Sequence, residues 1–368
     1  MHLTELFSNA DLQAQIAAGM VKPTAHPSGR LTILNYTQRA QFTPELWNHV
    51  TDLCRGIVVD GEGNLVARPF QKFWNLDDQR HPETLTANLP TTAPLLTRKL
   101  DGSLGIGYRL DGKWQVATRG AFTSDQAVWA SQWLAEHSPS IWPEGFTPLF
   151  EIVYPDNQIV VRYETSGLIL LAMVRIETGE EMDYAELTMW GERNGIPVVE
   201  SFDRPLTECV QEDVPNEEGY VAAWPRAGTT PLRVKIKYET YVRLHRLLTQ
   251  TNAVTVWEML RDGLDIKALT TGVPDEFKAW IDATKARFVN GFKAIEDAAR
   301  TAMSSYPGDT NAADPDAKKA FALWVMANHK ELAPMLFAMI SGKQYAPIIW
   351  KTIRPRGDEE KTFKVDEE

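Results

Sequence analysis

The sequence predicts an α+β protein, in which a domain of antiparallel sheets is followed by an all-α C-terminal domain. Short runs of strand character, separated by turn residues, fill the chain from Leu31 to about Lys237. After Tyr241 the apolar residues instead recur with helical spacing. A chain of 368 residues is long enough for two domains with separate cores. We therefore expect one domain over residues 1–240 and a second over residues 241–368.

The strands of the first domain are predicted from apolar and β-branched runs. Asp111-Gly112 lies between two such runs and is typical of a hairpin turn. Helices are expected near residues 124–136 and 183–194, where the strand character is interrupted. The expected strands span residues 31–36, 55–60, 104–110, 113–119, 148–154, 167–176, 220–224 and 232–237.

The second domain is predicted to be helical because its apolar residues recur at spacings of three, four or seven. Pro274 suits the first turn of the first such helix. Further apolar helical segments are expected over 321–329, 333–342 and 345–353, and the charged tail, 357–368, is expected to fray. The periodic residues of the first helix are Phe277, Ile281, Phe288, Phe292, Ile295 and Ala299.

Net charge, apolar runs and cysteine content limit the kinds of partner and site that the chain is expected to have. The net charge of −11 gives no general support for a nucleic-acid partner, so such a partner would need a local basic patch. No apolar run is long enough to cross a membrane, and the first residues lack a basic-then-apolar signal. Cys54 and Cys209 are too few and too far apart for a disulfide framework or a zinc site. We expect a cytoplasmic protein with no membrane partner.

Lys99 is the first candidate for chemistry. It stands in the segment KLDGS, between two predicted strands, together with Asp101, Gly102 and Ser103. A lysine at the mouth of a sheet is either a solvated charge or a nucleophile placed where a phosphate can reach it. The K-x-D-G string is too short to decide between these alternatives.

Other charged residues lie on predicted strands. Lys235 and Lys237 alternate with Val234 and Ile236, which places both ammonium groups on one strand face. That face is either solvated or a pair of cations that binds a polyphosphate. Glu151, within an apolar run, either points to water or has a partner. Surface positions are the simpler interpretation when each of Glu218, Arg55 and Lys72 is taken alone.

Taken together, these elements form an ordered series. It runs R-G from Arg55, K-F-W from Lys72, K-x-D-G-S from Lys99, T-R-G around Arg119, and then F-E-x-V, E-G-Y-V and K-I-K. This order resembles the covalent nucleotidyltransferases and, within them, the phage-type RNA ligase 1 family. The resemblance covers roughly residues 30–245 in detail. The C-terminal part is similar in its helical character and only loosely in its residues.

The resemblance implies an ATP-dependent RNA ligase. Lys99 would attack the α-phosphate of ATP and release pyrophosphate, leaving lysyl-AMP. The AMP would pass to the 5′-phosphate of an RNA, and a 3′-hydroxyl would displace it to seal the strand. The family further implies Mg²⁺, or Mn²⁺, and single-stranded RNA or broken tRNA as the partner. The helical domain would then select the RNA, and we expect a monomer without a protein partner.

The resemblance also assigns roles to individual residues. Trp74 would stack on the adenine. Arg119 stands where the family usually has lysine, so the positive charge is kept but the side chain is planar and larger. The residues implied to contact ATP are Tyr36, Arg55, Lys72, Trp74, Glu151, Glu218, Lys235 and Lys237. Those implied to bind metal are Glu151 and Asp265. Those implied to support activity in other ways are Asp101, Gly102, Arg119 and Tyr241.

Three other functions remain open at this point. A DNA ligase or an mRNA capping enzyme would share K-x-D-G, but both normally carry a small β-barrel where this chain is predicted to be helical. A non-catalytic RNA-binding protein on a ligase fold would not need Lys99, Glu151, Lys235 and Lys237, all of which are present.

Overall fold

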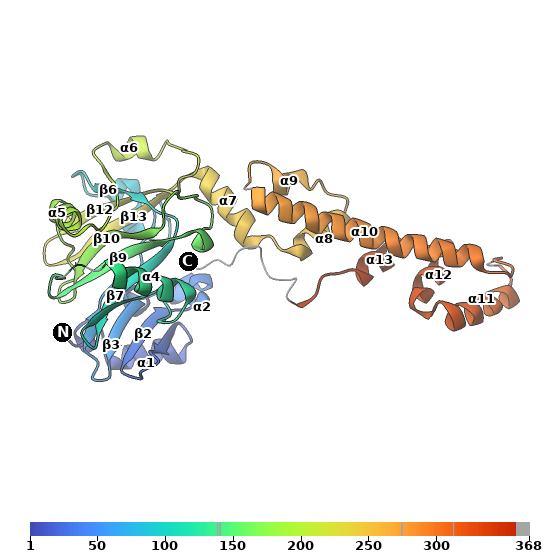
Figure 1. The fold of residues 1–368 in the computed structure, drawn as a ribbon, viewed down its shortest axis with the longest axis horizontal. Coiled ribbons are helices and arrows are strands. Elements are labelled where there is room, and N and C mark those ends of the chain that lie inside the picture. Colours follow the sequence, from blue (N-terminus) through green and yellow to red (C-terminus); the bar gives the residue numbers. More distant parts are fainter. Residues whose placement is uncertain (138, 140, 274, 312, 358–368) are drawn as a thin grey trace. The chain divides into compact units, whose positions relative to one another are not determined.

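The protein forms two compact units in a computed structural model that describes residues 1–137, 139, 141–273, 275–311 and 313–357 (Figure 1). The first unit comprises residues 1–243, and the second begins at Leu244. Sheets make up the first unit and helices the second. The predicted α+β class, with antiparallel sheets followed by helices, is confirmed.

Three sheets build the first unit, and all their strand pairs are antiparallel except β13 with β5. Sheet one has the order β1 (Val21–Ala25), β2 (Leu31–Tyr36), β3 (Arg55–Asp60), β4 (Leu65–Ala67). Sheet two has the order β10 (Gly167–Arg175), β9 (Phe146–Val153), β7 (Ser103–Leu110), β8 (Lys113–Ala117). Sheet three has the order β11 (Ser201–Phe202), β6 (Leu95–Lys99), β12 (Gly219–Arg226), β13 (Thr229–Lys237), β5 (Trp74–Asn75).

Capping residues delimit the helices that cover these sheets. The Asp183 carboxylate accepts a hydrogen bond from the first turn of α5, and Gly195 ends that helix in the left-handed conformation. Helix α4 packs along β8, β7 and β10 (Figure 1). The helices of this unit are α1 (Asn9–Ala17), α2 (Gln38–Phe42), α3 (His49–Leu53), α4 (Asp125–His137), α5 (Tyr184–Asn194) and α6 (Leu206–Cys209), and α7 (Glu239–Gln250) leads into the second unit.

Strands β9 and β10 of sheet two are covered on both faces, which explains why they are almost continuously apolar. On β9, Leu149 packs in a core shared with sheet one, whereas Phe150 and Ile152 pack in the core under α4 and α5. Because side chains alternate along a strand, Glu151 shares the face of Leu149. The one charged residue in this run therefore points toward sheet one and not toward the helices.

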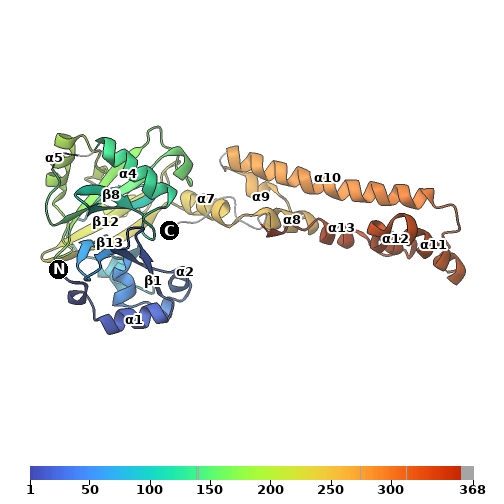
Figure 2. The same cartoon turned by 60° about the horizontal axis from the view of Figure 1, so that its bottom comes forward.

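The second unit is organised around one long helix, α10. Its predicted apolar residues Phe277, Ile281, Phe288 and Ala299 are buried, and helices α8, α9, α12 and α13 contact it (Figure 2). Pro274 and residues 358–368 of the predicted tail lie outside the described residues. None of the described helices combines the length and the apolar character needed to cross a membrane. The helices are α8 (Ala253–Arg261), α9 (Lys267–Thr270), α10 (Asp275–Ser305), α11 (Pro315–Asn328), α12 (Ala333–Ile340) and α13 (Ala346–Thr352).

The core under α4 should dominate the stability of the first unit. Leu134 of α4 is completely buried, so Leu134→Ala should cost about 2–5 kcal/mol of unfolding free energy through lost contacts and a cavity. Val128 lies on the same helix but is 44% exposed, and Val128→Ala should cost no more than about 0.5 kcal/mol. Denaturant unfolding of the full chain measures both variants, and equal losses would contradict this packing.

Candidate active site

A buried carboxylate joins two lysines at one end of sheet three. Gly219, the first residue of β12, pairs with Lys99 on β6 and with Lys237 on β13. The carboxylate of Glu218, one residue earlier, lies 2.8 Å from the Lys99 Nζ and 3.0 Å from the Lys237 Nζ. Glu218 is only 1% exposed, and such a buried charge needs partners of opposite sign. The strand register therefore assembles a Lys99–Glu218–Lys237 triad.

Two glycines allow the backbone to approach closely at this site. Gly219 has a φ of 139°, and a Cβ there would lie 2.0 Å from the Ile236 carbonyl oxygen. A Cβ on Gly102 would lie 2.5 Å from the Ile152 carbonyl oxygen and 3.0 Å from Glu151 Cγ. The turn that follows Lys99 can therefore rest against β9 only because residue 102 lacks a side chain.

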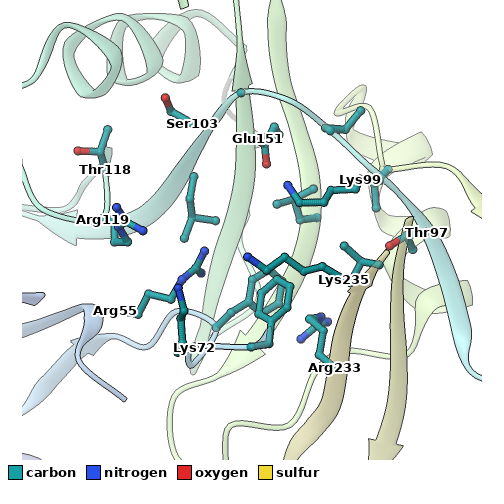
Figure 3. Close-up of a pocket in the computed structure, with 18 of the residues that line it drawn as sticks. Arg55, Lys72, Thr97, Lys99, Ser103, Thr118, Arg119, Glu151, Arg233 and Lys235 are labelled. Carbon is teal, nitrogen blue, oxygen red and sulfur yellow. The ribbon is translucent and has the colours of Figure 1, made fainter. Parts of the chain in front are cut away.

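A cavity of about 360 Å³ opens beside Lys99 and is lined by residues of all three sheets. Figure 3 shows the ammonium groups of Lys99 and Lys235 directed into one space, with the Glu151 carboxylate close to Lys99. This volume is within the range of small-molecule sites. The basic residues lining it are Arg55, Lys72, Arg98, Lys99, Arg119, Arg233 and Lys235, and the acidic ones are Glu151 and Glu181.

The lining of the cavity shows which way the lysines of the K-I-K strand point. Lys235 lines the cavity, and Lys237, on the same strand face, is bound to Glu218 with its side chain 14% exposed. The alternative that this pair forms a solvated outer face is therefore wrong. The surface interpretation is also wrong for Arg55 and Lys72, which line the cavity, and for Glu218, which is buried.

Tyr36 is a shared acceptor for two cations in the cavity wall. Its hydroxyl oxygen accepts a hydrogen bond from Arg119 Nη1 at 2.6 Å and from Lys72 Nζ at 3.3 Å. Burial alone would raise the pKa of Tyr36, but Arg119, Lys72 and Arg55 outweigh burial and lower it to about 8. Arg119 also lies over the Tyr36 ring, 4.9 Å from its centroid. The arginine at this position thus both donates to Tyr36 and stacks on it.

Lys72 lies among aromatic rings. Its Nζ is 4.9 Å from the ring centroid of Trp74, 5.0 Å from that of Tyr36 and 5.7 Å from that of Trp47. Desolvation, assisted by Arg55 and Arg119, lowers the pKa of Lys72.

Trp74 stacks on His81 with ring centroids 3.8 Å apart. It is not among the described residues that line the cavity. Its stacking on adenine therefore stays a prediction.

Glu151 lines the cavity near several other carboxylates. Burial raises the pKa of Glu151 to about 8, with Lys99 acting in the opposite direction and Glu218 and Asp101 adding to the increase. The alternative that Glu151 points outward to water is wrong, because it lies in the cavity wall. A cation bound nearby would favour its charged form.

Asp101 is 3% exposed and is not among the described residues that line the cavity. Its carboxylate accepts hydrogen bonds from the Tyr241 hydroxyl at 2.7 Å and from the Val160 and Val161 N–H groups at 2.8 Å each. Asp101 therefore holds neighbouring parts of the protein together and does not face the cavity.

Arg233 and Glu181 form an ion pair in the cavity wall that the sequence analysis missed. Two hydrogen bonds of 2.7 Å join them, and the Arg233 guanidinium lies 4.1 Å from the ring centroid of Phe70. The alternation that places Lys235 and Lys237 on one strand face also places Arg233 there, so this residue could have been found. No pattern in the sequence marks Glu181.

Asp265 lies in the second unit, where its carboxylate accepts a hydrogen bond from the Lys267 N–H at 2.9 Å, at the start of α9. Its role as a metal ligand stays a prediction. Within the described part of the chain, no three His, Cys, Asp or Glu side chains gather in a way that could hold a metal ion by themselves.

Titration of Tyr36 tests the cation cluster directly. Its pKa of about 8 lies below the ordinary value of 10.0, so the phenolate favours the folded state. This contribution to stability should be complete above about pH 10 and lost as the pH falls through about 8. Ultraviolet absorbance should detect a phenolate appearing near pH 8 that is missing in Tyr36→Phe and retained in Tyr108→Phe, because burial raises the pKa of Tyr108 to about 12. A difference spectrum without this phenolate would contradict the cluster.

Sequence comparisons with known proteins find RNA ligases. Residues 53–216 match the sequence profile of a family described as RNA ligase. A Thermovibrio ammonificans protein, provisionally assigned as an RNA ligase, is 32% identical over 209 residues, which are 53% of each chain. The RNA ligase of Rhodothermus phage RM378 is 24% identical over 295 residues, or 61% of this chain and 66% of its own.

Among solved structures, an archaeal ATP-dependent RNA ligase aligns over 91% of this chain and 96% of its own, at 14% identity and a TM-score of 0.46, too low to assign a fold. The chain thus spans 53% of the length of the first curated relative and 66% of the second. Residues 53–216 of the chain are therefore similar to RNA ligases, including those of two phages.

Proposed function

We propose that the protein is an ATP-dependent RNA ligase that joins 5′-phosphate and 3′-hydroxyl RNA ends. The observation that carries this proposal is the position of Lys99, whose ammonium reaches a cavity lined by basic side chains from three sheets. A cluster of cations in a small cavity suits a nucleoside triphosphate, whose phosphates carry several negative charges. A lysine beside such phosphates is placed for nucleophilic attack.

In the first step, Lys99 Nζ would attack the α-phosphorus of ATP. The Lys99 ammonium would first give up a proton, which the paired Glu218 carboxylate is placed to accept. The neutral amine then forms the phosphorus–nitrogen bond, the bond from the α-phosphorus to the bridging oxygen breaks, and pyrophosphate leaves. Before the reaction Lys99 is paired with Glu218. Because Lys237 shares the same carboxylate, Glu218 keeps a partner when Lys99 turns to the phosphate. Lys235, Arg55 and the other cavity cations would stabilise the charge that develops on the phosphates.

Glu151 fits a divalent cation bound together with substrate phosphates. Mg²⁺ is usually bound by one or two carboxylates together with substrate phosphates and water, and not by a complete protein cage. The Glu151 carboxylate lines the cavity close to Lys99, and burial raises its pKa, as expected for a carboxylate that lacks enough positive charge. Mg²⁺ or Mn²⁺ bound there would neutralise phosphate charge.

The later steps would transfer AMP from Lys99 to the 5′-phosphate of an RNA, and a 3′-hydroxyl would then displace AMP. We assign ATP chemistry to the domain over residues 1–240 and RNA selection to residues 241–368, and we propose a monomer that acts in tRNA repair. The described residues of the second unit form helices and no strand, which favours an RNA ligase over a DNA ligase or capping enzyme with a β-barrel.

Replacement of the nucleophile tests the proposal against a non-catalytic RNA-binding protein. The wild-type chain with labelled ATP and Mg²⁺ should give a covalently labelled band on a denaturing gel, and Lys99→Ala should give none. The variant should keep some capacity to join RNA that already carries 5′-AMP, because that step does not use the lysine bond. Lys113→Ala, a change at an exposed lysine of β8, should label normally. Full labelling of Lys99→Ala would exclude Lys99 as the nucleophile.

The role in tRNA repair is tested by competition between substrates. The protein should seal a tRNA broken in its anticodon loop faster than a linear single-stranded RNA, and a nicked duplex least well. Rates of product formation at equal RNA concentration measure this order. Equal rates on broken tRNA and linear RNA would contradict tRNA repair and leave the ligase activity standing.

A further inference from the structure

We propose that the segment Asn157–Tyr163, here called the clasp, positions the turn that carries Lys99, with Tyr163 as a positioning residue for this nucleophile. The inference rests on the proposed function and adds residues that belong to none of the motifs that identify the family. The clasp lies between β9 and β10 and belongs to the first unit.

Tyr163 and its neighbours hold Asp101 from two sides. The N–H of Asp101 donates a hydrogen bond of 2.7 Å to the Tyr163 hydroxyl oxygen. In the opposite direction, the N–H groups of Val160 and Val161 donate to the Asp101 carboxylate. Both the backbone and the side chain of Asp101, two residues after Lys99, are thus fixed by the clasp. Burial raises the pKa of Tyr163, although the Asp101 N–H acts in the opposite direction, so the hydroxyl stays neutral.

The start of the clasp holds the other side of the same turn. Asn157 is 7% exposed, and its Oδ1 accepts a hydrogen bond of 3.0 Å from the Ser103 hydroxyl. Its Nδ2 donates a bond of 2.7 Å to the Ile152 carbonyl oxygen, the atom against which Gly102 packs. Asn157 therefore ties the residue after Gly102 to β9.

These contacts allow Tyr163 to affect catalysis although it does not touch the substrate. Tyr163 is not among the described residues that line the cavity, so its influence on Lys99 must pass through the turn. Attack on phosphorus requires the nucleophile within a narrow range of distance and direction, and a displacement of about 1 Å can cost about 100-fold in rate. We therefore expect loss of the contacts on either side of Gly102 to lower the reaction rate and to leave the affinity for ATP nearly unchanged.

Tyr163→Phe tests this role, because it removes the hydroxyl and keeps the ring. We expect the single-turnover rate of lysyl-AMP formation at saturating ATP to fall by about tenfold or more, with the ATP concentration for half-maximal rate unchanged. Sealing of RNA that already carries 5′-AMP should stay near the wild-type rate. Tyr108→Phe is the matched control: it removes a buried hydroxyl that donates a bond of equal length, 2.7 Å, to Gln115. It should label at the wild-type rate.

Two further variants keep the inference open to refutation if Tyr163→Phe folds poorly. Asn157→Asp replaces the donor to the Ile152 carbonyl oxygen at nearly constant volume, and it should also slow lysyl-AMP formation selectively. Tyr241→Phe removes another partner of Asp101, so the double variant Tyr163→Phe/Tyr241→Phe should lose less than the product of the two single losses.

The inference is overturned if Tyr163→Phe labels at the wild-type rate, or if lysyl-AMP formation and sealing fall equally together with the melting temperature. A wild-type protein that forms no lysyl-AMP would instead refute the proposed function.

Discussion

The buried carboxylate of Glu218 is the constraint on which the rest of the site depends. An ionised carboxylate that is 1% exposed is unstable in a protein interior unless cations lie within hydrogen-bond distance. Lys99 and Lys237 meet that requirement from strands on either side of β12. Removing either lysine would take one cation from this buried carboxylate, so the positions of the three side chains depend on one another. Strand order, register and the glycine at residue 219 serve this arrangement together.

The positions of the site residues therefore depend on the strands and turns that surround the triad. The turn after Lys99 rests on β9 through Gly102, and Glu151 enters the cavity from the same strand. Tyr36, on sheet one, holds Arg119 and Lys72 through hydrogen bonds to one oxygen. Three sheets thus contribute charges of both signs to a common space, and none of them carries a complete site alone.

Much of this could be predicted from the sequence, because strand alternation is a strong local signal. The strands at 31–36, 55–60 and 232–237, and the face shared by Lys235 and Lys237, follow from alternation and turn residues. The partners of those charges could not be predicted in the same way. Glu181 and Tyr163 reach the site across distant segments, and only the packed structure determines which residues meet. Trp74 carries the aromatic character expected of a base-stacking residue, yet in the structure its ring stacks on His81.

The contrast between the cavity and the whole chain affects how polyanions arrive. The protein carries a net charge of −11, while seven basic side chains line a single cavity of the first unit. The net charge repels phosphate-rich molecules at long range, whereas the low-dielectric walls of the cavity focus the field of its basic side chains into the opening. The rate at which a polyanion meets this cavity should therefore depend on ionic strength. Such a charge distribution disfavours unspecific binding of nucleic acid to the chain and favours the association of a polyanion with the basic cavity.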